Sequence, residues 1–240
     1  MKHVSLATLI GLGGLAGSQL TGCIISSRDQ PEVGYITAYW ELRDVSGTTT
    51  ICPSGFTTAV LMSQPLSDSG DPIGAPIMDK FDCDDRGGET FALTPGPYQT
   101  WLEIRSDDLV SLYARSYAQF PDITHRDATV DFEVLNDGGY LELRWELRDA
   151  MTDVPISCAD ANVVSVQATA TSATSSFTAI APCGDLYALS APQLEGTYTV
   201  SVAALGAGEA PIAVAPDITD QVINRELPVT DLGTVLIPVE

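Results

Sequence analysis

Two stretches of the chain are nearly identical. Residues 34–44 read Gly-Tyr-Ile-Thr-Ala-Tyr-Trp-Glu-Leu-Arg-Asp, and residues 139–149 read Gly-Tyr-Leu-Glu-Leu-Arg-Trp-Glu-Leu-Arg-Asp. In both, apolar residues alternate with polar ones, which is the period-two pattern of a β-strand with one buried face. Trp40 and Trp145 stand on the apolar side of these stretches. The pattern therefore predicts two equivalent strands, each of which places a tryptophan in a hydrophobic core.

Further landmarks return in the same order after each stretch. They are Cys52 and Cys158, Cys83 and Cys183, Gly-x-Tyr at 96–98 and 196–198, and Pro-Asp-Ile-Thr at 121–124 and 216–219. A period of roughly one hundred residues is too long for a solenoid repeat and matches the size of one β-sandwich. We therefore expect a tandem duplication, with domain 1 at residues 34–137 and domain 2 at residues 138–240.

The segments between the landmarks favour an all-β fold. Short runs of apolar and β-branched residues are separated by Gly, Pro, Asp and Ser, which is typical of antiparallel sandwiches. We expect two tandem antiparallel β-sandwich domains of immunoglobulin-like or prealbumin-like type. The further strands are predicted at 57–62, 90–93, 99–104, 110–118 and 129–135, and at 163–169, 176–181, 186–190, 198–204, 212–215, 223–229 and 234–239.

The cysteines indicate an oxidising compartment. Cys52, Cys83, Cys158 and Cys183 form an even set, and four sulfurs allow three pairings. If each copy folds alone, each closes its own bridge, which pairs Cys52 with Cys83 and Cys158 with Cys183. A zinc site is the alternative, but the chain has no Cys-x-x-Cys half-site.

The turns before two strands resemble those of a known group of sandwich domains. Residues 93–98, Leu-Thr-Pro-Gly-Pro-Tyr, and residues 194–198, Leu-Glu-Gly-Thr-Tyr, are similar to the Leu-Pro-x-Gly-x-Tyr turn of prealbumin-like and carboxypeptidase-regulatory-like domains. The order of tryptophan strand, cysteine, valine-rich strand, cysteine and Gly-x-Tyr strand also resembles uncharacterised repeat domains of bacterial lipoproteins. The resemblance implies the fold and no chemistry.

The N-terminus predicts export. Lys2 precedes an apolar stretch, Val4 to Leu20, without acidic residues, and Leu20-Thr21-Gly22-Cys23 resembles a bacterial lipobox. We expect a signal peptide at residues 1–22, an acylated (palmitate-bearing) Cys23 and a lipidated tether at residues 23–33. The alternative, an uncleaved membrane helix, fits less well because glycines dilute the run. The expected location is the outer membrane or cell surface, in contact with the membrane through the lipid.

The charge excludes one class of partner. The formal net charge is −21, with 32 acidic and 11 basic residues. Such a field repels phosphate backbones, so nucleic acid is excluded as a partner. The excess of acidic residues could serve to bind cations or basic partners, or it could simply keep the surface well solvated.

No catalytic motif stands out. The exported chain would keep a single histidine, His125, in a charged segment predicted to be a solvent-facing loop. No cofactor is expected, and no enzyme activity, although two of the many carboxylates could in principle converge as in glycosidases. A weak Ca²⁺ candidate lies in the acidic run predicted to be a loop at Cys83. Its members are Asp79, Asp82, Asp84 and Asp85, without EF-hand spacing.

Aromatic residues outside the core suggest a binding surface in the first copy. Trp101 alternates with the inward residues of its strand, and Tyr113 and Tyr117 follow on the next one. Exposed aromatic patches mark binding surfaces. The alternative is burial of these side chains against the second domain.

These observations predict a non-enzymatic cell-envelope lipoprotein that acts as a structural or adhesive interaction module, with a protein or glycan partner. The alternative function is a cation- or carbohydrate-binding module. The identity of the partner does not follow from the residues.

Overall fold

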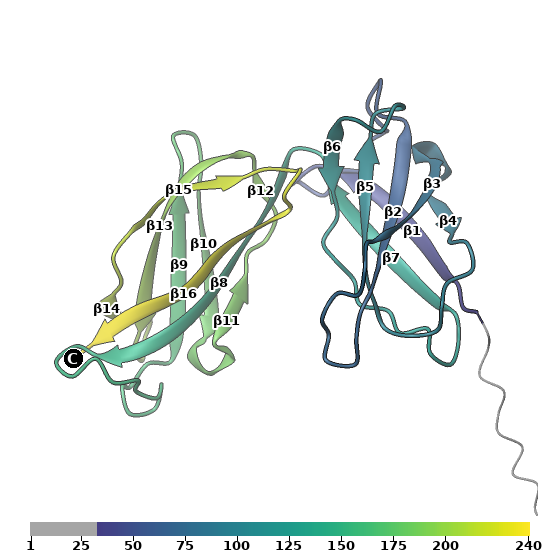
Figure 1. The fold of residues 1–240 in the computed structure, drawn as a ribbon. Helices are drawn as coiled ribbons and strands as arrows, with labels where there is room; N and C mark the ends of the chain where they lie inside the picture. The colour runs from purple at the N-terminus through teal and green to yellow at the C-terminus, as the bar shows by residue number, and fades with distance from the viewer. Residues whose placement is uncertain (1–32) are drawn as a thin grey trace, which may run out of the picture. The chain divides into compact units, whose positions relative to one another are not determined.

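The computed structural model describes residues 33–240, which form an almost entirely β structure (Figure 1). The predicted signal peptide, Cys23 and nearly all of the tether lie outside the described residues. None of the helices in residues 33–240 is long and apolar enough to cross a membrane.

The first sandwich has two sheets. One has the strand order β4-β1-β7 and the other β3-β2-β5-β6. The strands are β1 (Ile36–Arg43), β2 (Thr58–Pro65), β3 (Ile77–Asp82), β4 (Gly87–Glu89), β5 (Tyr98–Arg105), β6 (Leu112–Arg115) and β7 (Ala128–Leu135), with the short helix η1 (Cys83–Asp85) between β3 and β4.

The second sandwich repeats this plan. One sheet has the order β11-β8-β12, with β16 also paired to β8, and the other has the order β10-β9-β13-β14, with β15 paired to β13. The elements are β8 (Gly138–Asp149), β9 (Ser165–Thr171), β10 (Ser176–Pro182), η2 (Cys183–Asp185), β11 (Tyr187–Leu189), β12 (Gln193–Leu194), β13 (Gly196–Leu205), β14 (Pro211–Val214), β15 (Ile218–Ile223) and β16 (Val229–Val239).

The two tandem sandwiches confirm the predicted fold class, and most of their strand pairs are antiparallel as expected. One pair in each sandwich is parallel: β1 runs beside β7, and β8 runs beside β16 (Figure 1). Parallel neighbours need a long connection between them. Here the rest of the sandwich supplies that connection, because the paired strands are the first and last of each copy.

Each sandwich has its own hydrophobic core and one disulfide. The bridges are Cys52–Cys83 and Cys158–Cys183, the pairs expected from the repeat. Trp40 and Trp145 are buried in the two cores, as the alternation predicts.

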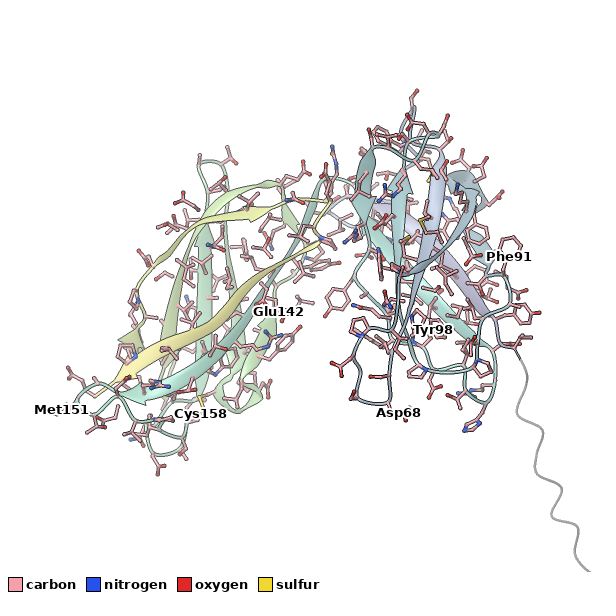
Figure 2. All side chains as sticks on the ribbon, viewed as in Figure 1. Asp68, Phe91, Tyr98, Glu142, Met151 and Cys158 are labelled. Atoms are coloured by element: carbon pink, nitrogen blue, oxygen red, sulfur yellow. A yellow bond between two sulfur atoms is a disulfide. The ribbon has the colours of Figure 1, made fainter. Side chains whose placement is uncertain are left out.

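Each core contains the same pair of side-chain hydrogen bonds to the backbone. The indole N–H of Trp40 donates to the carbonyl of Cys83 over 2.9 Å, and that of Trp145 donates to the carbonyl of Cys183 over 3.0 Å. The buried tyrosines of the Gly-x-Tyr turns, Tyr98 (Figure 2) and Tyr198, each donate to the carbonyl four residues earlier over 2.9 Å. The buried indole and phenol groups thus each find a backbone carbonyl as acceptor, as buried polar groups require.

Four strands differ from the sequence prediction. The predicted strands at 90–93 and 223–229 lie mostly in loops, β4 and β12 were not predicted, and β15 shares only Ile223 with a predicted strand. The fourth is β3. The acidic run that was predicted to be a loop contains β3 and η1. Asp79 points inward with only 2% of its surface exposed. A charged residue at this core-facing position breaks the alternation of apolar and polar residues by which the other strands were predicted. The prediction was wrong there because a carboxylate took the place of an apolar residue.

Candidate functional site

The outer face of β5 carries a cluster of side chains around a buried carboxylate. Along β5, Leu102 and Ile104 point into the core, while Trp101, Glu103 and Arg105 point to the other side of the sheet. Glu103 nevertheless is only 1% exposed. An acidic side chain is seldom buried so fully unless it is paired.

Three donors satisfy Glu103. The Trp101 indole N–H donates to its Oε1 over 2.8 Å, and the Arg105 Nε donates to its Oε2 over 2.6 Å. Arg115, on the neighbouring strand β6, also donates to Oε1. Each carboxylate oxygen therefore accepts at least one charge-assisted or indole hydrogen bond, which is the arrangement that makes a buried carboxylate tolerable.

The environment keeps Glu103 ionised. Burial by itself would raise the pKa of this carboxyl, but the hydrogen bonds from Trp101 and Arg105 and the positive charges of Arg115 and Arg105 outweigh it. The pKa of Glu103 is held below its usual range. A carboxylate that is ionised at neutral pH and has both oxygens hydrogen-bonded is suited to holding other side chains in place, and poorly suited to giving or taking a proton.

Glu103 fixes two of the side chains that face solvent. The Arg115 guanidinium lies 5.6 Å from the centre of the Trp101 ring, within cation–π range, while both groups bond to the same carboxylate oxygen. Behind them in the sheet, Val60 and Met62 are the cross-strand partners of Glu103 and Trp101, and both are buried. Trp101 and Arg115 are therefore orientated before any ligand arrives.

Trp101 and Arg115 line an open groove of about 470 Å³. Ligand pockets commonly have volumes in this range and combine aromatic walls with a few fixed polar groups. Glu142, labelled on β8 in Figure 2, contributes a carboxylate that is ion-paired with Arg144. The lining residues are Gln99, Trp101, Arg115, Ser116, Tyr117, Ala118, Phe120, Glu142, Leu227, Pro228 and Val229.

The structure brings together two of the three aromatic residues singled out in the sequence. Trp101 and Tyr117 both line the groove. Tyr113 instead packs against the first core, where its ring centre lies 5.1 Å from that of Phe56. Its other side is covered by the Arg225 guanidinium, 4.3 Å from the ring centre. Tyr113 therefore is not a wall of this groove.

Sequence reasoning missed Glu103, Arg115 and Phe120. Phe120 is 66% exposed in the groove, and its isolated position in a loop gave no periodic signal. Glu103 and Arg115 are distant in sequence and meet only because β5 and β6 are antiparallel neighbours. Their pairing could have been anticipated only with the strand register in hand.

The four aspartates proposed for Ca²⁺ do not form a site. Asp79 is buried, whereas Asp84 and Asp85 are exposed on η1, and Asp82 accepts the backbone N–H of Asp84 as the N-cap of that helix. Within residues 33–240, no three His, Cys, Asp or Glu side chains gather where they could hold a metal ion. His125 lies in the loop before β7, as predicted.

Comparison with known proteins gives distant structural neighbours. No family model and no curated protein sequence matches the chain. A leucine-rich repeat protein from Bacteroides thetaiotaomicron aligns with 87% of this chain and 26% of its own length, at 11% identity and a TM-score of 0.33. The Bacillus anthracis TIE protein aligns with 87% of this chain and 34% of its own length, at 12% identity and a TM-score of 0.32.

A third neighbour is similar in length. GBS52, the minor pilin of Streptococcus agalactiae, aligns over 86% of this chain and 96% of its own length, at 11% identity and a TM-score of 0.29. The chain spans only about a third or less of the first two neighbours. At these levels of similarity, the function has to be inferred from the residues of the chain itself.

Proposed function

We propose that the chain is a non-enzymatic cell-envelope protein that binds another protein or a glycan through the groove at Trp101. The observation that carries this proposal is the buried Glu103, which holds Trp101 and Arg115 in fixed positions on the outer face of a sheet. Burying a carboxylate between two partly exposed arginines contributes little net stability. Preorganisation of a binding surface is a reason to keep such a cluster, because fixed side chains lose less entropy when a partner binds.

Substitution of Trp101 tests the proposal. The full chain would be immobilised and exposed to an array of oligosaccharides and to an extract of the native envelope. We expect Trp101→Ala to lose at least about tenfold in capture, which is typical of an aromatic residue at the centre of an interface. Phe91→Ala is the matched control, because Phe91 projects from the same sandwich with 81% of its surface exposed and does not line the groove (Figure 2). Equal capture by both variants would rule the groove out.

Of these two kinds of partner, a carbohydrate is favoured by the presence of Trp101 and Tyr117 in one groove. Aromatic rings offer an apolar face, and Arg115 and Gln99 offer nearby hydrogen-bond donors. With a net charge of −21, the chain would repel anionic polymers, so a neutral oligosaccharide fits best. If the wild type binds neutral sugars and the Trp101→Ala variant does not, the groove binds carbohydrate rather than protein.

A lipid anchor at Cys23 is the proposed means of attachment. The lipobox-like residues 20–23 support a signal peptide at 1–22 and a lipidated tether at 23–33, with the protein on the outer membrane or cell surface. Three acyl chains exceed the two hydrophobic signals that stable anchoring requires. Cys23→Ser should move the protein from the membrane fraction to the soluble fraction, and continued membrane partition would contradict the anchor. Protease treatment of intact cells distinguishes the exterior from the periplasm.

A further inference from the structure

Four of the five strands in one sheet of the second sandwich carry no charged residue. The strands β9, β10, β13 and β14 contain no Asp, Glu, Lys or Arg, although these residues make up 18% of the chain. Hydroxyl groups line the outer face instead: Thr169 and Thr178 lie 3.2 Å apart across the β9–β10 pair, and so do Thr171 and Ser176. On a chain of net charge −21, these four strands therefore form a surface that another acidic molecule can approach with less repulsion than a charged sheet would cause.

The strand β10 is an open edge of that sheet. It pairs with β9 alone, in seven regular residue pairs without a bulge. The hairpin bond from Ser172 N–H to the Ser175 carbonyl sets the alternation, so Phe177, Ala179 and Ala181 form the hydrogen-bonded pairs with β9.

The alternate residues of β10 face away from β9. Ser176, Thr178 and Ile180 therefore turn their backbone N–H and C=O groups outward. Across residues 33–240, no hydrogen bond to these backbone groups is found. Ile180 is 52% exposed, so the edge is also accessible.

The equivalent edge of the first sandwich is protected. Counting back from Cys83 and Cys183, Lys80 corresponds to Ile180, and the buried Asp79 corresponds to Ala179. An edge lysine and an inward-pointing charge are two of the devices by which natural sheets prevent edge-to-edge pairing. The second sandwich has neither device on β10, and only Pro182 interrupts its end.

We propose that β10 pairs with β10 of a second copy of this chain, antiparallel about a two-fold axis at Thr178. In this register Thr178 lies opposite itself, and Ser176 lies opposite Ile180 of the other copy. Each such pair exchanges two backbone bonds, which gives roughly six hydrogen bonds across the interface. A second copy suits the edge because the register is self-complementary and because the paired strands bring no carboxylates together.

Sedimentation of the full chain over a range of concentrations tests the pairing. We expect the wild type to dimerise and Thr178→Lys to weaken the dimer by about tenfold or more, because the two lysines would lie directly opposite each other. Ser201→Lys is the matched control, since it adds the same charge to the same sheet on the interior strand β13. A wild type that stays monomeric, or an equal effect of the two variants, would overturn the proposal.

Two further variants exclude misfolding as the cause. Ile180→Pro removes an outward N–H that β9 does not use, so it should leave the thermal unfolding transition in place while abolishing the dimer. Thr178→Cys should be joined to itself by a short bifunctional thiol reagent, since opposed α-carbons in this register lie about 5.5 Å apart. Ser201→Cys should not be joined. Cross-linking of the Thr178 variant to a different envelope protein instead would assign the edge to that protein and defeat self-pairing.

Discussion

The two sandwiches share their interior and differ on one outer face. Their tryptophans bond to the carbonyls of equivalent cysteines, and their Gly-x-Tyr tyrosines bond to equivalent carbonyls. On the outer face of the corresponding strands β5 and β13, however, Trp101 is replaced by Ser201 and Glu103 by Ala203. The interiors of both copies meet the same requirements of folding, whereas the ionic cluster at Glu103 on β5 has no equivalent on β13.

The edges differ in the same way. The edge strand β3 carries a lysine and a buried aspartate, while its counterpart β10 carries only uncharged residues. The first sandwich therefore has a preorganised ionic cluster and a protected edge, and the second has an outer sheet face with few charges and an open edge. This contrast suggests that the two copies have taken on different interactions.

Removal of a disulfide is expected to produce the largest effect, and it tests whether residues 34–137 and 138–240 are separate folding units. Replacing both cysteines of one bridge by alanine should cost roughly 3.5 kcal/mol, since the bridges close loops of 31 and 25 residues. We expect the loss to be confined to the sandwich that contained the bridge. Hydrogen exchange resolved by peptide measures this, and loss of protection in both sandwiches at once would show that they unfold as one unit.

Much of the fold follows from the sequence, because core strands keep the period-two alternation and the repeat shows it twice. The cysteine pairing follows from the same repeat. The parallel pairing of β1 with β7 does not, since alternation gives a strand its faces and says nothing about its neighbour. Likewise Trp101 was recognisable as an outward aromatic, but its bond to Glu103 and the role of Arg115 depend on register.

Loss of the indole hydrogen bond should affect both copies alike. Trp40→Phe and Trp145→Phe each remove the indole donor to a cysteine carbonyl and also remove buried ring volume, at a cost of roughly 3 kcal/mol. Thermal unfolding followed by circular dichroism measures both variants. A large difference between them would mean that the two cores are less equivalent than their hydrogen bonds indicate.

The effect of neutralising Glu103 should be specific to the first sandwich, because β13 has no equivalent carboxylate. Glu103→Gln leaves two arginines without their buried carboxylate and should lower stability at pH 7 by about 2 kcal/mol. Because the pKa of Glu103 is depressed by its donors, its contribution is present above the unfolded-state pKa and disappears as the pH falls through the folded-state value. The difference between wild type and variant should therefore shrink below about pH 4.3. Ala203→Gln, at the equivalent outer position of β13, is the control and should show no such pH dependence.

The smallest effect, with the opposite sign, is expected at the edge strand β3. Burial raises the pKa of Asp79 more than the hydrogen bond from the Phe91 N–H lowers it, and the second carboxylate oxygen has no partner in the described residues. A raised pKa means that the ionised form costs stability once the pH exceeds the unfolded-state value of about 3.9. Asp79→Asn should therefore stabilise the first sandwich by about 1 kcal/mol at pH 7 and should have little effect at pH 3.

Denaturant titration at the two pH values measures this difference. Asp82→Asn is the matched control, because Asp82 lies on the same strand but is exposed, so its neutralisation relieves no desolvation. Stabilisation by Asp79→Asn would show that the inward charge on β3 is kept at a cost in stability, as expected of a device that protects an edge. Destabilisation at pH 7 would show that Asp79 supports the fold of its own sandwich, and the contrast between the edges of β3 and β10 would then need another explanation.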